Sequence, residues 1–426
     1  MTHFGIISPA AVGHLNPMTT LGRELKRRGH RVTLIGAPFG KSKALAAGLD
    51  FWVIGESEFP SDRTVERYAK LGQLTGLDAL AYNLSLVKED AAMILRETPA
   101  AAKAAGVDAF LIDQVSYEGI TVAQYLDLPY ITACTGVMLN REYTIPPFFT
   151  SWNYNPAWWA RLRNRYGYAK SDRIGKPVME VIDEFRKEWK LPIYSHPEQA
   201  YSKLAQLSPQ PAEFEFPRSA LPKFFHFTGP YYNQASREPV AFPWEKLTGQ
   251  PLIYASMGTL QNRLIEIFQS IAEACVGLDA QLVISLGGAG KPESLPKLPG
   301  SPLVVGYAPQ LELLQKAAVA ITHAGMNTAL ESLSNGVPMV AIPITNDQPG
   351  VAARVAWTGA GEVVPLPSLD VPKLRTAIQR VLTQDSYKKN ASRLQEAIAL
   401  AGGVSRAADI IEQAISTGKP VLSANR

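Results

Sequence analysis

The chain has few cysteines and lacks the segments that mark secreted or membrane-spanning proteins. Cys134 and Cys275 are its only cysteines among 426 residues, so we expect neither a disulfide framework nor a cysteine metal site, and we expect a reducing compartment. The start MTHFGIISPA has no basic segment before a long apolar core, so it predicts a first strand and no signal peptide. No apolar run approaches the roughly 20 residues that span a bilayer. These features predict a cytoplasmic protein without a transmembrane segment, and they leave peripheral membrane contact open.

Runs of like charge are also missing. The 42 basic and 38 acidic residues are spread along the chain and leave a net charge of +4, so we expect no nucleic-acid partner. The hydrophobic content of 46% with 19% charged residues is ordinary for a globular protein. At roughly 150 residues per domain, the length predicts two or three domains.

Two common nucleotide-binding motifs are absent. The first strand, predicted at 3–8, is not followed by G-x-G-x-x-G, which argues against a redox Rossmann domain. The stretch GAPFGKS at 36–42 has three residues between its glycines, whereas a P-loop has four. Neither motif therefore predicts the function.

Strands and helices alternate in two successive halves. After the first strand, Asn16 is the predicted N-cap of a helix with Pro17 at its first position, and a second strand follows at 31–36. The polar, proline-bearing stretch 231–251 has no period and reads as a linker, and a new strand opens at 252–256. We predict an α/β fold with two Rossmann-like, doubly wound domains. The predicted units are 1–230, the linker 231–251, 252–403, and a C-terminal helix with a tail at 404–426.

The stretch 307–348 carries the clearest binding signal. A short, apolar, β-branched strand at 319–322 leads through His323, Ala324 and Gly325 into a helix. The unpaired N–H groups and the positive end of such a helix form a site for phosphate.

Side chains around this turn extend the prediction to a nucleotide. Asn327, Thr328 and Glu331 share one helix face. Asn and Thr can bind phosphate oxygens, while a carboxylate one turn further suits the two hydroxyls of a ribose. Asp347 and Gln348 follow the strand at 339–342, at a carboxyl end where open α/β sheets bind ligands. We therefore predict a nucleotide that carries a hydroxylated group.

In the first half, His14 and Asp113 are candidates for acid–base chemistry. His14 is predicted in the loop before the first helix, whose positive end disfavours an imidazolium and so leaves a neutral base near pH 7. Asp113 ends the strand predicted at 108–112, and parallel strand ends open on one edge, so a His–Asp contact is plausible. Taken singly, His14 could be structural and Asp113 could cap the next turn.

The stretch 307–348 resembles the signature of UDP-dependent glycosyltransferases of glycosyltransferase family 1, which have the GT-B fold. Between Gln310 and His323 the sequence is two residues shorter than the plant form, and from His323 onward the spacing agrees. Tyr307 and Met326 stand where plant members usually have Trp. The matching residues are Tyr307, Ala308, Pro309, Gln310, His323, Gly325, Asn327, Thr328, Glu331, Gly336, Val337, Pro338, Pro343, Asp347 and Gln348.

This resemblance implies a role for each half. The second domain would bind the donor, with Tyr307 stacked on uracil, Gln310 beside the base and Glu331 on the ribose. The sugar hydroxyls would be bound by Asp347 and Gln348. The diphosphate would be met by the helix start with its donors, namely Ser256, Thr259, His323, Gly325, Asn327 and Thr328.

The first domain would bind the acceptor, and the C-terminal helix would cross back onto it. The resemblance implies that His14, assisted by Asp113, removes the acceptor's proton and that the anomeric configuration inverts. Gln348 favours UDP-glucose, with UDP-GlcNAc and TDP-sugars as alternatives. No DxD-like acidic pair stands near the turn, so we expect metal independence and no cofactor besides the UDP-sugar co-substrate.

Aromatic residues crowd the stretch 142–168 without a regular period, which suits an irregular apolar pocket or lid, with core packing as the alternative. We predict an apolar, hydroxylated small molecule as acceptor, in line with a resemblance to bacterial macrolide and carotenoid glucosyltransferases. The predicted acceptor contacts are Tyr143, Phe148, Phe149 and Trp152. Two other functions remain open: a nucleotide-sugar epimerase of the same fold, or a non-catalytic nucleotide-sugar or lipid-binding protein, which would have no need of the base His14.

Overall fold

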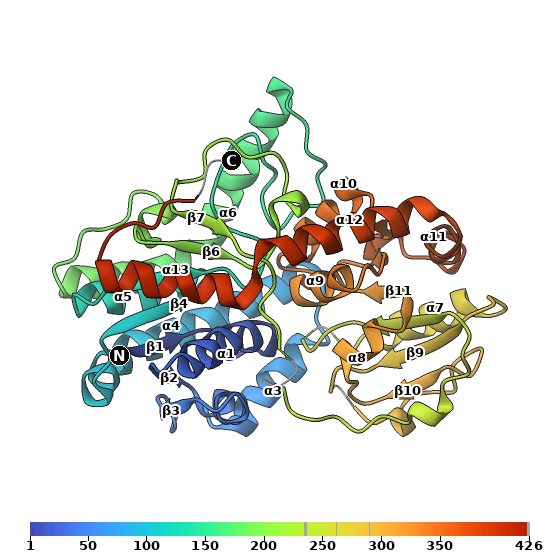
Figure 1. The fold of residues 1–426 in the computed structure, drawn as a ribbon, viewed down its shortest axis with the longest axis horizontal. Coiled ribbons are helices and arrows are strands. Elements are labelled where there is room, and N and C mark those ends of the chain that lie inside the picture. The colour runs from blue at the N-terminus through green and yellow to red at the C-terminus, as the bar shows by residue number, and fades with distance from the viewer. Residues whose placement is uncertain (234–236, 261, 289, 424–426) are drawn as a thin grey trace.

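Two parallel sheets lie next to each other in the computed structural model, which describes residues 1–233, 237–260, 262–288 and 290–423. Figure 1 shows the first sheet and its helices in the left half of the view and the second in the right half. The predicted α/β fold with two doubly wound domains is confirmed.

The first sheet has seven parallel strands in the order β3-β2-β1-β4-β5-β6-β7. Its central strands are short and fully buried, as expected for parallel strands covered on both faces. The strands are β1 (His3–Ile7), β2 (Arg31–Gly36), β3 (Asp50–Val53), β4 (Ala109–Asp113), β5 (Tyr130–Ala133), β6 (Gln206–Ser208) and β7 (Phe225–Phe227). The helices are α1 (Val12–Arg27), α2 (Lys41–Ala46), α3 (Ser61–Leu71), α4 (Gly76–Ala105), α5 (Tyr117–Tyr125) and α6 (Trp158–Glu188).

The second sheet repeats this order with six parallel strands, β10-β9-β8-β11-β12-β13. Its strands are β8 (Leu252–Ser256), β9 (Gln281–Ser285), β10 (Leu303–Val305), β11 (Ala317–Thr322), β12 (Met339–Ala341) and β13 (Gly361–Val363). The helices are α7 (Ile265–Cys275), α8 (Gln310–Leu314), α9 (Met326–Ser334), α10 (Gln348–Thr358), α11 (Val371–Thr383), α12 (Asp385–Ala401) and α13 (Gly403–Thr417).

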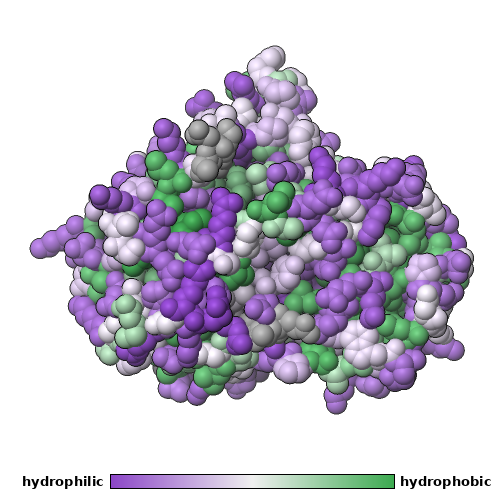
Figure 2. Space-filling view, in the orientation of Figure 1, coloured by the Kyte–Doolittle hydropathy of each residue, from purple (hydrophilic) through white to green (hydrophobic). Residues whose placement is uncertain are grey.

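Helix α13 leaves the second domain and lies on the first (Figure 1). Its apolar residues Ala407 and Ile411 are buried in the same cluster as Leu21 of α1. At the rim of this contact, Arg28 forms an ion pair with Glu412 at 2.7 Å, and Figure 2 shows hydrophilic side chains over the crossing of α1 and α13. Helix α13 is therefore part of the first domain's core.

A second connection between the domains is deeply buried. Phe214, from the segment between β6 and β7, packs into the core of the second domain. Next to it, the Glu215 carboxylate accepts hydrogen bonds from Nε and Nη2 of Arg354 on α10, at 2.9 and 2.6 Å. Burial raises the pKa of Glu215, but Arg354 and Arg218 outweigh this effect and lower it to about 2. Removing one partner of such a pair costs about 3–5 kcal/mol, so the contact holds the two domains together.

Two predictions on local structure are wrong. Helix α1 begins after Ala11 and not after Asn16, so Pro17 lies inside it. The aromatic stretch is irregular only up to Ala157, because α6 begins at Trp158. This helix has a buried face that packs on α4 and α5, and this tertiary contact orders a segment whose aromatic content had suggested a loop.

None of the helices in the described part of the chain is both long enough and apolar enough to cross a membrane. Both cysteines, Cys134 and Cys275, are free.

Candidate active site

His14 and Asp113 meet at the carboxyl edge of the first sheet. Asp113 ends β4 and is fully buried, and its Oδ2 lies 2.8 Å from Nδ1 of His14. The His14 side chain keeps 31% of its surface exposed, so the ring is partly open to solvent. The structure thus brings together the two residues that the sequence proposed as a pair.

Thr135, which the sequence did not single out, completes this cluster. It follows β5, the strand beside β4, and its hydroxyl lies 2.9 Å from Oδ2 of Asp113 and 2.8 Å from Nδ1 of His14. A carboxylate only accepts hydrogen bonds, so both the hydroxyl and the Nδ1–H group donate to Asp113. The sequence could have indicated Thr135, because it lies just past the end of a parallel strand, at the sheet edge where Asp113 was predicted. Among the described residues, Nε2 of His14 has no hydrogen-bond partner, and its lone pair can accept a proton.

The neighbours of His14 shift its pKa. Burial lowers its pKa, but the charge of Asp113, the hydrogen bond to Asp113 and the charge of Asp347 together raise the pKa above its ordinary value of 6.5. The carboxylates of Asp113 and Asp347 therefore make His14 easier to protonate than an ordinary histidine, and its neutral state near pH 7 stays a prediction. His14 is a stronger base than an ordinary histidine.

The corrected start of α1 also explains a contact between the domains. Pro17 has no N–H, so the carbonyl of Gly13, four residues earlier, lacks its partner within the helix. That carbonyl accepts a hydrogen bond of 2.7 Å from Nδ2 of Asn327 on α9. The start of α9, predicted to bind phosphate, therefore touches the residue before His14.

The turn between β11 and α9 is built around His323. Ala324 has a left-handed φ of 65°, which is rare outside glycine and asparagine, and Gly325 is the N-cap of α9. A Cβ on Gly258 would lie 2.4 Å from the His323 ring, and one on Gly325 would lie 2.6 Å from it. The imidazole therefore fits between two residues that have to be glycine.

Burial lowers the pKa of His323 to about 4, although a hydrogen bond with the backbone of Ser256 raises it. His323 is thus neutral at pH 7 and can offer an N–H group but no full charge. Ser256 ends β8 beside this turn, and its Oγ accepts the N–H of Gly258 at 3.3 Å. Thr259 follows, half-buried, and Thr328 is buried in the first turn of α9. The predicted diphosphate donors therefore gather at one sheet edge.

The predicted ribose carboxylate is engaged by other side chains. Glu331 is 1% exposed and forms an ion pair with Arg237, a linker residue that the sequence did not single out. Its Oε2 also accepts a hydrogen bond of 2.6 Å from Nε2 of Gln310, whose Oε1 accepts one from Tyr254. Gln310 therefore orients Glu331. Arg237 had no signal in the sequence, because only the path of the linker brings it to α9.

Tyr307 leaves 42% of its surface exposed at the same edge, so its ring face is open for stacking. A Cβ on Gly288, in the glycine loop after β9, would lie 4.0 Å from the Tyr307 ring. Gly288 thus borders the ring closely.

Asp347 and Gln348 lie at the start of α10 and approach the first domain. Oδ2 of Asp347 accepts a hydrogen bond of 3.1 Å from the N–H of Val137, and a Cβ on Gly136 would come within 2.5 Å of it. Burial raises the pKa of Asp347, while the N–H of Val137 and the charge of His14 lower it, and the net shift is upward. Oε1 of Gln348 accepts the N–H groups of Ile344 and Thr345, so this side chain shapes the loop that carries Asp347.

The four predicted acceptor residues lie in different surroundings. Phe148 contacts the core of the second domain, and its carbonyl packs on Gly350 of α10. Phe149 packs edge-to-face on Phe148 with ring centroids 5.3 Å apart. Trp152 lies under the guanidinium of Arg163 on α6, and Tyr143 is 55% exposed. Contact of these residues with an acceptor stays a prediction.

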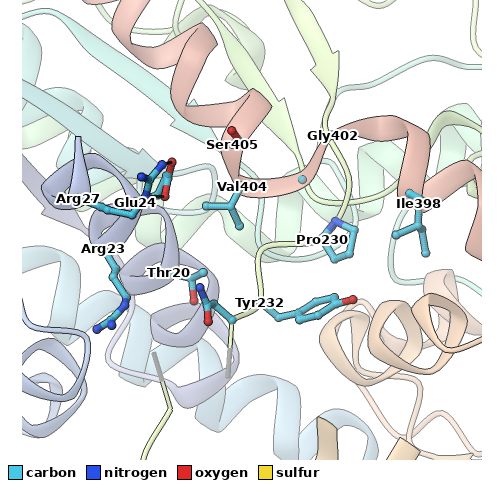
Figure 3. Close-up of a pocket in the computed structure, with 13 residues that line it drawn as sticks. Thr20, Arg23, Glu24, Arg27, Pro230, Tyr232, Ile398, Gly402, Val404 and Ser405 are labelled. Atoms are coloured by element: carbon cyan, nitrogen blue, oxygen red, sulfur yellow. Dashed lines mark hydrogen bonds and ion pairs between the residues drawn. The ribbon is translucent and has the colours of Figure 1, made fainter. Parts of the chain in front are cut away.

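A hollow of about 480 Å³ lies away from these residues, where α1, the start of the linker and the α12–α13 junction meet (Figure 3). Its lining includes Arg23, Tyr232 and Ser405 and none of the site residues predicted above. Within the described ranges, no three His, Cys, Asp or Glu side chains are grouped so that they could hold a metal ion.

Comparisons with known proteins show the family and the fold. A family model described as "UDP-glucoronosyl and UDP-glucosyl transferase" matches residues 81–398. Zeaxanthin glucosyltransferase of Pantoea ananas is 34% identical, and the alignment covers 99% of this chain and 98% of that protein. Zeaxanthin glucosyltransferase of Pseudescherichia vulneris is 30% identical, with 99% and 100% covered. Among solved structures, the calicheamicin glycosyltransferase CalG4 superposes with a TM-score of 0.74 at 22% identity, covering 99% of this chain and 100% of that one.

Proposed function

The chain belongs to the UDP-glucoronosyl and UDP-glucosyl transferase family, and we propose that it transfers glucose, with inversion, from UDP-glucose to a hydroxyl of an apolar small molecule. The observation that carries this proposal is the contact between the two halves of the site. The hydrogen bond from Asn327 to Gly13 puts the N-terminus of α9 next to the residue before His14. A diphosphate on α9 would then lie close to the base.

In the proposed reaction, Nε2 of His14 takes the proton of the acceptor hydroxyl. The oxygen attacks the anomeric carbon from the face opposite UDP, the carbon–oxygen bond to UDP breaks, and UDP leaves with the electron pair. Asp113 stabilises the imidazolium that forms, and Thr135 helps to hold both groups in place. The proton later passes to water, which restores the base.

The leaving diphosphate would be stabilised by the α9 N-terminus, Asn327, Thr328 and neutral His323, whose single N–H would turn from the Ser256 backbone to the diphosphate. The positive end of α1 also lies beside the start of α9. This arrangement supports a mechanism that requires no metal ion. The prediction is that activity persists in excess EDTA.

Donor binding would replace two contacts inside the protein. Ribose hydroxyls on Glu331 would take the place of Arg237, while Gln310 keeps the carboxylate oriented. Uracil would stack on the open face of Tyr307. Asp347 would exchange the N–H of Val137 for sugar hydroxyls, and Gln348 makes glucose the preferred sugar.

The acceptor proposal is supported by the two zeaxanthin glucosyltransferases, which align over the whole chain. We take zeaxanthin as the first acceptor to test and a macrolide alcohol and a phenol as comparisons. UDP release from UDP-glucose is measured with and without each acceptor, and the anomeric configuration of the product is determined.

The expected result is release of UDP that depends on the acceptor and yields a β-glucoside. A retained configuration would overturn the displacement by His14. Tight UDP binding without turnover on any acceptor would instead favour a binding protein, and UDP release without an acceptor would favour an epimerase-like reaction of the donor.

A further inference from the structure

The start of helix α6 exposes a stripe of large apolar side chains. Trp158, Trp159, Leu162 and Tyr166 are 74%, 47%, 57% and 73% exposed. At 3.6 residues per turn, these positions fall within an arc of about 100° on the helix. Large apolar residues are commonly exposed one at a time, but four in one stripe mark a contact surface. We call these four residues the α6 stripe.

The opposite side of the helix fixes the direction of this stripe. Ala160, Asn164 and Gly167 are buried, and Nδ2 of Asn164 donates to the carbonyl of Tyr143 at 3.0 Å. The α6 stripe therefore points away from the body of the protein. Figure 1 shows α6 projecting beyond both sheets at the top of the view, and Figure 2 shows mostly pale residues of intermediate hydropathy at this projection.

Basic residues accompany the stripe. Arg161, Arg165, Lys170 and Arg173 are exposed on the same part of α6. Between Trp158 and Arg173 the sequence contains a single acidic residue, and its charge is engaged by an ion pair with Arg141. The surface around the stripe is therefore positively charged.

We propose that the α6 stripe docks on the surface of an anionic lipid bilayer. Tryptophan and tyrosine favour the level of the lipid headgroups, because their rings are apolar and their N–H and O–H groups are polar. Arginine and lysine beside them are attracted to anionic headgroups. A stripe of tryptophan, leucine and tyrosine bordered by cations matches such a surface in both respects.

Docking would also bring His14 nearer to an acceptor that is dissolved in the bilayer. Thr135 lies beside His14 and is the first residue of the segment 135–157, which contains no helix and leads to Trp158. An apolar alcohol dissolved in the bilayer could then reach the base along this segment. This last step rests on the proposed function, whereas docking itself does not.

The test is sedimentation of the full chain with vesicles, without donor or acceptor. Wild type is expected to bind vesicles of phosphatidylcholine with phosphatidylglycerol, and to bind less as salt is raised. Trp158→Ser combined with Leu162→Ser, and Arg161→Glu combined with Arg165→Glu, should each lower the partition coefficient at least about tenfold. The matched controls Leu400→Ser and Lys389→Glu change exposed residues of α12 and should bind as wild type does.

Glucosylation of a water-soluble phenol is measured alongside and should be equal in all variants, which shows that they are folded. Failure of the wild type to bind anionic vesicles would overturn the proposal, as would stripe variants that bind like wild type. A dimer that the stripe variants dissociate, without vesicle binding, would assign this surface to a second copy instead. Absence of turnover by the wild type on zeaxanthin, the macrolide alcohol and the phenol alike would contradict the proposed function and leave the vesicle result intact.

Discussion

Each domain places a histidine at the carboxyl edge of its sheet, and the protein shifts the pKa of the two histidines in opposite directions. In the first domain, His14 follows β1 and faces Asp113 at the end of β4. In the second, β8 and β11 occupy the corresponding places, and His323 follows β11 without a carboxylate beside it. The pKa of His14 is raised, and that of His323 is lowered to about 4.

The difference shows how one strand order supports two kinds of chemistry. Both imidazoles are desolvated, which favours the neutral form. Only His14 has carboxylates close enough to reverse that effect. His323 is buried against two glycines. Burial keeps it neutral at pH 7, so it can only donate or accept hydrogen bonds. The first edge can therefore take up a proton, while the second can bind an anion with fixed donors.

The largest expected effect comes from removing the base. His14→Ala should lower kcat by about 10³-fold, or about 4 kcal/mol, because no other described side chain stands at Nε2 to take the proton. The affinity for UDP should stay within about twofold, since the donor groups lie in the other domain. Calorimetry and UDP release measure the two quantities, and exposed His196→Ala is the control. Acceptor-dependent turnover at the wild-type rate would eliminate His14 as the base.

A smaller effect is expected when Asp113 loses its charge, which makes the surroundings of His14 more like those of His323. Asp113→Asn keeps the shape but removes the charge that raises the pKa of His14. A base acts when unprotonated, so kcat/KM rises as pH increases through that pKa. In the variant the inflection should move to lower pH, and the plateau should fall by about 10²-fold. The pH profile measures both, and an inflection that stays in place would contradict the assigned cause.

In the second domain, the donor role of His323 can be tested separately from charge. His323→Ala should weaken UDP-glucose binding by about tenfold, the value of one hydrogen bond to a charged group, and His323→Gln should recover part of it through its amide N–H. Because the pKa is about 4, His323 should add no pH dependence to this affinity between about pH 6 and 8. Calorimetry with UDP-glucose at several pH values decides this, and a charged His323 would appear as tighter binding at low pH.

The smallest effect is expected at Thr135. Thr135→Val removes the hydroxyl that contacts both Asp113 and His14, and should lower kcat by about threefold to tenfold without changing UDP affinity. Thr135→Ser restores the hydroxyl and should restore the rate. Equal rates in Val and Ser variants would show that Asp113 alone orients the ring.

The strands and the turn between β11 and α9 could be predicted because their signals are local. The segment 252–256 is β8 as predicted, and Gly325 stands where the turn needs a glycine. The start of α1 could not be predicted, because the Asn16–Pro17 pair favours a helix start at that point. The helix begins earlier because Asn327, more than 300 residues away, satisfies the carbonyl that Pro17 leaves open.

The sequence by itself determined the order of strands and helices and the two-domain fold, since these depend on periodicity along the chain, and it contains the motif from which the donor residues are predicted. The tertiary structure decided which groups meet and which charge they carry. Arg237 reaches Glu331, and Asp347 reaches the N–H of Val137 near His14, only through folding. A pKa depends on burial and on the distances to other charges, so the opposite shifts of His14 and His323 follow from the packed domains and not from the motif.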